Sequence, residues 1–201
     1  EPVIHSKLME MLRLYLILGG MPAVLKEYFL NNDLAECQHI QAGLLQTYRS
    51  DFGKYAKISQ QKHLQKVFDA TPRLVGQRIK FSNIDADTKS RDLKQAMNLL
   101  EQAGVILPVY ATAASGVPLG AQIKENKFKV VFLDVGLMQN ACGLQGDLSI
   151  AKDITQINSG SLAEQLVGQE LKAHANNDQP GNLFFWTRDK QGSLAEVDYV
   201  V

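Results

Sequence analysis

Three acidic residues near the end of the chain have a spacing that suits metal-ion chemistry. Glu196 and Asp198 lie two residues apart in an apolar run, and Glu164 lies in an expected helix before it. Residues two apart in a strand point to the same side, so both strand acids are expected to reach toward the helix acid. Converging carboxylates can hold Mg²⁺ or Mn²⁺, which activate water against a phosphodiester. Glu164, Asp198 and Glu196 are therefore candidate metal ligands, and Glu164 and Asp198 are candidate catalytic residues. The structural alternative is a solvated helix face and an exposed strand end.

A second group of polar residues has the chemistry of a DNA-reading helix. It follows one face of the helix expected from Asp87 to Ala103, and the lysines of a following hairpin accompany it. Such side chains can bond base edges in a major groove, while lysines on a wing commonly meet phosphates. The candidate nucleic-acid-binding residues are Arg91, Gln95, Asn98, Gln102, Lys124, Lys127 and Lys129. Two alternatives remain open: an ordinary solvated surface diluted by acidic neighbours, and a protein-docking or lid-like winged helix.

The composition of the chain limits the classes of function that it can have. Lys and Arg number 21, and Asp and Glu also number 21, so no overall charge draws the chain to nucleic acid or an anionic membrane. Cys37 and Cys142 are far apart and lack the spacing of a zinc site, which suits reduced thiols in a cytoplasm. No stretch is long and apolar enough to predict a membrane span or a signal peptide. We expect a soluble, cytoplasmic protein without membrane contact.

Apolar spacing and breaker residues predict the elements that must position these candidates. Asp134, directly after a strand, is expected to close that strand and open a short helix, and Thr71-Pro72 is expected to end a helix. The expected helices cover about His5–Leu18, Pro22–Leu30, Asp33–Tyr55, Ser59–Thr71, Asp87–Ala103 and a last helix from Ser161 or Ser159 to His174. The expected strands cover Val105–Ala111, Phe128–Leu133, Leu183–Thr187 and Ala195–Val201.

This order of elements predicts an α+β chain with two domains. Residues 1–145 are expected to form a helical and winged-helix-like domain, and the polar stretch from Gly143 to Gly160 is expected to hold the boundary. Residues 146–201 are expected to form the truncated front half of a second α/β domain, because the final strand lacks its next partner. Glu1 lacks an initiator Met, so we expect an internal fragment of a larger protein.

Several stretches together resemble one family that spans nearly the whole chain. The runs are Tyr15–Pro22, Tyr48–Asp51, Lys129–Leu137, Gly160–Leu171, Leu183–Arg188 and Glu196–Val200. They are similar to the C-terminal domain of unknown function attached to many prokaryotic AAA-type ATPases.

This resemblance implies an ATP-binding ATPase module upstream of Glu1, a winged-helix-like middle and an end similar to the PD-(D/E)XK (restriction-endonuclease-like) nuclease superfamily. In that pattern Glu164 matches the helix acid and Asp198 matches the first strand acid. The pattern's further acid and lysine would lie beyond Val201, so the fragment itself is expected to be inactive. The function expected from it is action on, or docking to, nucleic acid, with DNA and an ATPase domain in cis as partners. The alternative is a non-catalytic regulatory module that binds a protein partner.

Overall fold

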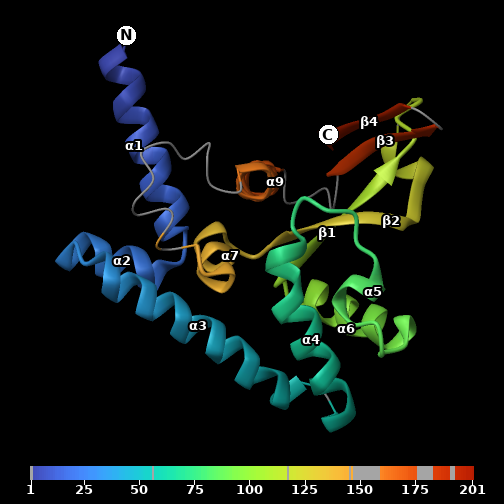
Figure 1. The fold of residues 1–201 in the computed structure, drawn as a ribbon, viewed down its shortest axis with the longest axis horizontal. Helices are drawn as coiled ribbons and strands as arrows, with labels where there is room; N and C mark the ends of the chain where they lie inside the picture. The colour runs from blue at the N-terminus through green and yellow to red at the C-terminus, as the bar shows by residue number, and fades with distance from the viewer. Residues whose placement is uncertain are drawn as a thin grey trace.

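A computed structural model describes residues 2–55, 57–116, 118–144, 146, 159–175, 183–190 and 193–201. Helices and strands are mixed along the chain, so the predicted α+β class is confirmed (Figure 1). The helices are α1 (Pro2–Leu18), α2 (Pro22–Asn31), α3 (Leu34–Tyr55), α4 (Ile58–Leu74), α5 (Phe81–Ile84), α6 (Ser90–Gln102), α7 (Val135–Cys142) and α9 (Ser159–His174), with a 3₁₀ turn η1 (Leu119–Gln122). The strands are β1 (Ile106–Thr112), β2 (Ile123–Phe132), β3 (Phe184–Lys190) and β4 (Ser193–Val200).

The strands form one mixed sheet in the order β2-β1-β3-β4. β1 pairs antiparallel with β2, while β3 joins the other side of β1 in parallel and pairs antiparallel with β4. The two predicted domains therefore share a sheet, since β1 comes from one and β3 from the other. Much of the stretch expected to hold their boundary, residues 147–158, lies outside the described residues.

The helices before the sheet follow the sequence pattern closely, except that α5 was not predicted and α4 departs from its expected bounds at both ends. Thr71-Pro72 was expected to break a helix, but α4 continues to Leu74. Pro72 lies in the last turn of α4, where the Thr71 hydroxyl donates to the Val67 carbonyl at 2.6 Å, and the helix ends two residues later. The same helix begins at Ile58, with Lys57 rather than Ser59 at its N-cap: the Gln60 side-chain oxygen accepts from the Lys57 amide at 3.3 Å, and the Gln60 amide donates to the Lys57 carbonyl at 2.8 Å.

Helix α6 is amphipathic, and its apolar face packs into the core as its sequence pattern predicts. Leu93, Ala96, Met97 and Leu100 are buried in the main core, whereas Ala103 is exposed at the C-cap. Phe68 of α4 packs against Phe132 of β2, with ring centroids 5.6 Å apart, and joins the helices to the sheet. The sequence α4, α5, α6, β1, β2 thus has the winged-helix order of helices followed by a hairpin.

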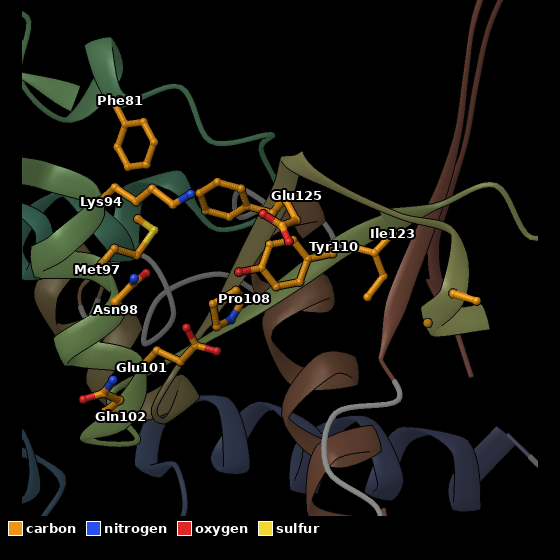
Figure 2. A pocket seen from close by; sticks show the side chains of 13 residues that line it. Phe81, Lys94, Met97, Asn98, Glu101, Gln102, Pro108, Tyr110, Ile123 and Glu125 are labelled. Carbon is orange, nitrogen blue, oxygen red and sulfur yellow. The ribbon is translucent and has the colours of Figure 1, made fainter. Parts of the chain in front are cut away.

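A groove of about 760 Å³ separates α6 from this hairpin (Figure 2). Met97 and Pro108 form part of its floor, and polar side chains of α6 and β2 form its rim. The groove opens beside the helix face that the sequence marks as a reading surface. None of the helices in the described part of the chain has the length and apolar character needed to cross a bilayer.

Candidate functional site

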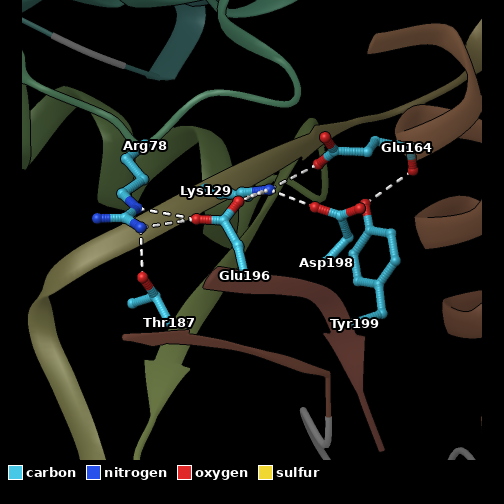
Figure 3. Close-up of polar contacts among 7 residues, drawn as sticks. All are labelled: Arg78, Lys129, Glu164, Thr187, Glu196, Asp198 and Tyr199. Carbon is cyan, nitrogen blue, oxygen red and sulfur yellow. Dashed lines mark hydrogen bonds and ion pairs between the residues drawn. The ribbon is translucent and has the colours of Figure 1, made fainter. Parts of the chain in front are cut away.

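The three candidate acids meet at one cation, the ammonium group of Lys129. Its Nζ lies 2.9 Å from Glu164 Oε2, 2.5 Å from Glu196 Oε1 and 2.8 Å from Asp198 Oδ1 (Figure 3). The Lys129 side chain is only 3% exposed and lies over the Phe185 ring, 5.6 Å from its centroid. The sequence correctly placed Glu164 beside the two strand acids, but it gave no indication of the lysine at their centre.

Three elements bring these four side chains together. Glu196 and Asp198 lie two residues apart on β4, so their side chains point to the same face of the strand. Lys129 comes from β2, at the opposite edge of the sheet. Because neighbouring strands lie about 4.8 Å apart, a side chain of β2 reaches β4 only if the sheet curls. Glu164 then approaches from α9, which packs along β2.

Arg78 extends the charged cluster at its outer side. This residue follows α4, and its guanidinium contacts Glu196 Oε2 through Nε at 3.0 Å and Nη2 at 2.8 Å. Its Nη2 also donates to the Thr187 hydroxyl of β3. Glu196 therefore bridges two cations, and the cluster ties the helical region to β3 and β4.

The protonation states in the cluster follow from burial and charge. Burial by itself would lower the pKa of Lys129, but hydrogen bonds to Asp198, Glu196 and Glu164 outweigh it and raise the pKa well above its ordinary value. Burial raises the pKa of Glu164, and the ammonium of Lys129 offsets part of that rise. Lys129 is therefore a fixed cation, which can donate hydrogen bonds but cannot accept a proton.

The arrangement does not fit the divalent ion that the family resemblance implies. A metal would need oxygen atoms of Glu164, Glu196 and Asp198 around a free point, and the Lys129 ammonium holds that point. Within the described residues, no group of three or more His, Cys, Asp or Glu side chains is arranged to hold a metal ion. The carboxylates instead satisfy a buried ammonium, whose burial without partners would be costly.

Polar side chains of α9 fasten this helix to the end of β2. Gln165 is fully buried and pairs with the backbone of Phe132 in both directions: Oε1 accepts from the amide at 2.8 Å and Nε2 donates to the carbonyl at 2.7 Å. One turn later, Gln169 accepts from the Val135 amide and donates to the Tyr15 hydroxyl. The run Gly160–Leu171 is one of the family-like stretches, meaning the six runs that carry the family resemblance. The residues that follow Glu164 in it thus have structural contacts that the sequence did not reveal.

Gly168 allows α9 to approach the sheet closely. A Cβ at this position would lie 2.5 Å from the Tyr199 hydroxyl oxygen and 2.6 Å from Val131 Cγ2. The Tyr199 hydroxyl in turn donates to the Glu164 carbonyl at 2.7 Å. The strand that carries Asp198 is therefore held against the helix that carries Glu164 by a second contact.

Asp134 joins the first helices to the sheet. Its Oδ1 accepts from the Leu137 amide at 2.9 Å, so the prediction that it opens a helix is confirmed. Its Oδ2 accepts from the Gly20 amide at 2.7 Å, which the sequence did not predict. Gly19 has φ +67° and faces the same carboxylate, while a Cβ at Gly136 would lie 2.5 Å from the Leu18 carbonyl oxygen. Two of the family-like stretches therefore interlock at this carboxylate.

The structure separates the candidate nucleic-acid residues into two groups. Those on α6 lie on its exposed side, and Lys124 is also exposed. The expectation of an exposed wing lysine is not met at Lys129, because three carboxylates enclose its ammonium. Lys127 is half-buried. The exposed members are Arg91, Gln95, Asn98 and Gln102 on α6 and Lys124 on β2.

Comparison with known protein families places most of the chain in one family. A domain of unknown function (DUF8612) matches residues 9–148, which include the winged-helix-like region and the strand that carries Lys129. No curated protein matches the chain. No solved structure matches it either.

Proposed function

We propose that this chain, which belongs to the DUF8612 family of domains of unknown function, is a non-catalytic protein-interaction region that positions an AAA-type ATPase. The link to an ATPase rests on the family-like stretches in the sequence. The lack of catalysis rests on one observation, the enclosure of the Lys129 ammonium by Glu164, Glu196 and Asp198.

The contacts of these acids argue for a structural role. General acid–base catalysis needs a group that exchanges protons near neutral pH, whereas Lys129 stays charged and the acids are engaged with it. The same residues connect β2, β4 and α9, and Arg78 adds the segment after α4. Such a cluster makes the helical region and the sheet behave as one rigid support for an interaction surface.

The exposed face of α6 and the adjacent groove together form the interaction surface in this proposal. Glu101 and Glu125 lie on the groove rim, close to the polar residues of α6. Carboxylates at this position repel phosphates over a distance of about 8–10 Å at ordinary salt, so they oppose the approach of a nucleic acid backbone. The zero net charge of the chain provides no compensating attraction.

Photo-cross-linking can identify the partner class. We expect p-benzoylphenylalanine in place of Gln102, at the groove, to yield a discrete adduct that protease removes and nuclease leaves intact. The matched control replaces exposed Gln46 on α3 and should yield no such adduct. Adducts at position 102 that disappear on nuclease treatment would contradict the proposal.

A second candidate function is docking to DNA through α6 itself. The observation that favours it is the exposed stripe of Arg91, Gln95, Asn98 and Gln102 on a helix in winged-helix position. Fluorescence anisotropy with a short DNA duplex separates the two candidates. DNA docking predicts affinity that falls steeply with salt and weakens on Arg91→Ala, whereas the protein-interaction proposal predicts neither.

A further inference from the structure

The groove between α6 and the β1–β2 hairpin has an aromatic floor. Phe81, Phe128 and Tyr110 follow one another along it, with ring centroids 6.1 Å apart for the first pair and 5.8 Å for the second. Phe128 is buried, while Phe81 and Tyr110 are half-buried and accessible from the groove. A volume of about 760 Å³ is in the range of pockets that hold a few side chains or a small molecule.

The polar rim of the groove lacks partners within the described part of the chain. The side chains of Lys94, Asn98, Glu101, Gln102 and Glu125 are exposed, and none forms a hydrogen bond or ion pair with a described residue. The other charged side chains of the site, such as Lys129 and Arg78, are fully engaged. The rim of the groove thus offers free hydrogen-bonding groups to a partner.

The charges on the rim are unevenly distributed. Figure 2 shows the carboxylates of Glu125 and Glu101 on either side of the Tyr110 hydroxyl, with Lys94 at the Phe81 end. Burial raises the pKa of Tyr110, and the charges of Glu101 and Glu125 raise it further. One end of the groove therefore offers two carboxylates and an aromatic ring.

We propose that this groove binds a peptide segment of a protein partner through an arginine side chain, held by Glu101 and Glu125 over Tyr110, with an apolar neighbour over Met97 and Phe128. Carboxylates bind a guanidinium through paired charge-assisted hydrogen bonds, and an aromatic face adds a cation–π contact. Lys94 repels a second cation at the Phe81 end, which sets the direction of the segment. The inference rests on the proposed protein-interaction function and names the chemistry of its partner.

Peptide titration of the 201-residue chain tests this assignment. The probes are three fluorescein-labelled peptides that share the pattern Leu-X-Leu-X, with Arg, Gln or Glu at X. We expect the Arg peptide to bind most tightly and to shift the NMR signals of Tyr110 and Phe128. The Glu101→Gln/Glu125→Gln variant should bind it about tenfold more weakly, since each partly exposed pair contributes modestly.

The matched control is Glu10→Gln/Glu36→Gln, which removes two exposed carboxylates from other helices and should leave the affinity unchanged. Equal affinity for the three peptides, or equal loss in both double variants, would overturn the groove assignment. The cross-linking experiment distinguishes failure of the arginine contact from failure of the proposed interaction function. A protein adduct at position 102 that survives Glu101→Gln/Glu125→Gln would reject the arginine contact and leave the interaction function standing.

Discussion

At the scale of single residues, the buried charge of Lys129 dominates the electrostatics of the site. Its ammonium is nearly inaccessible to water and is surrounded by Glu164, Glu196 and Asp198. A buried charge is tolerated only when partners replace its hydration, and three carboxylates replace it here. These acids in turn need a nearby cation, since burial already raises the pKa of Glu164.

Replacement of Lys129 by methionine should therefore destabilise the chain strongly. Lys129→Met keeps the length of the side chain but leaves neighbouring carboxylates facing one another, and breaking a buried ion pair in this way costs about 3–5 kcal/mol. Urea unfolding measures the loss. Lys124→Met, on the same strand but exposed, is the control and should change stability by less than about 0.5 kcal/mol. Similar results for the two variants would show that the cluster contributes no stability.

Tyr15, which contacts α9, makes the stability of the chain depend on pH in the alkaline range. Burial and the contact with Glu170 raise its pKa to about 12, whereas the unfolded value is 10.0. A raised folded pKa means that the native state holds its proton longer, so the stability contributed by Tyr15 is complete below pH 10.0 and is lost as pH rises to about 12. Unfolding curves of wild type and Tyr15→Phe should thus converge over this interval. A constant difference between pH 9 and pH 12 would contradict the contact.

At the scale of elements, α9 is the part whose position matters most. Its side chains contact β2, α7 and α1 through Glu164, Gln165 and Gln169, and Gly168 lets it lie close to Val131 and Tyr199. Much of this interface is polar and specific. A small displacement of the helix would break several of these hydrogen bonds together.

A methyl group on Gly168 should push α9 away from the sheet. In an exposed helix interior, Gly→Ala raises stability by about 0.5–1 kcal/mol, and Gly43→Ala on α3, where nothing lies within 4 Å, should show this gain. At Gly168 the contacts with Tyr199 and Val131 reverse the sign, with a loss of about 1–3 kcal/mol. Thermal unfolding of the two variants should therefore shift in opposite directions, and shifts in the same direction would refute the close packing.

The elements themselves were largely predictable, because apolar periodicity and turn residues are local properties. The buried face of α6 and the N-cap at Asp134 followed from spacing alone. The continuation of α4 through Pro72 did not, because a proline removes one backbone donor and disfavours helical geometry in the residue before it, whereas α4 keeps Pro72 inside the helix. The length of β2 was also missed, because its first half is polar and irregularly paired with β1.

At the scale of the whole molecule, the sequence predicted that the three acids lie together, but it did not predict that a lysine is their partner. Glu164, Glu196 and Asp198 share a short stretch of chain and a familiar pattern, whereas Lys129 is separated from Glu164 by 35 positions. Its approach depends on the curl of the sheet and on the pairing of β1 with β3. These are tertiary features without a local signal, so Lys129 was expected on an exposed wing.

This tertiary arrangement also gives the family-like stretches a common explanation. Those that contain Gly19, Asp134, Gln169 and Asp198 meet along α9 and the end of β2. They form an internal framework, while the polar rim of the groove beside α6 has no side-chain partner among the described residues. Interaction at the groove and rigidity at the framework are therefore separate properties of the molecule.

Calorimetric titration with MnCl₂ tests the central claim most directly, because it asks which cation the carboxylates hold. If the ammonium of Lys129 is their counter-ion, the wild-type chain should show no saturable Mn²⁺ binding up to millimolar concentration, and Asp198→Asn should give the same flat titration. Saturable binding by the wild type that Asp198→Asn abolishes would contradict the account and restore the metal site.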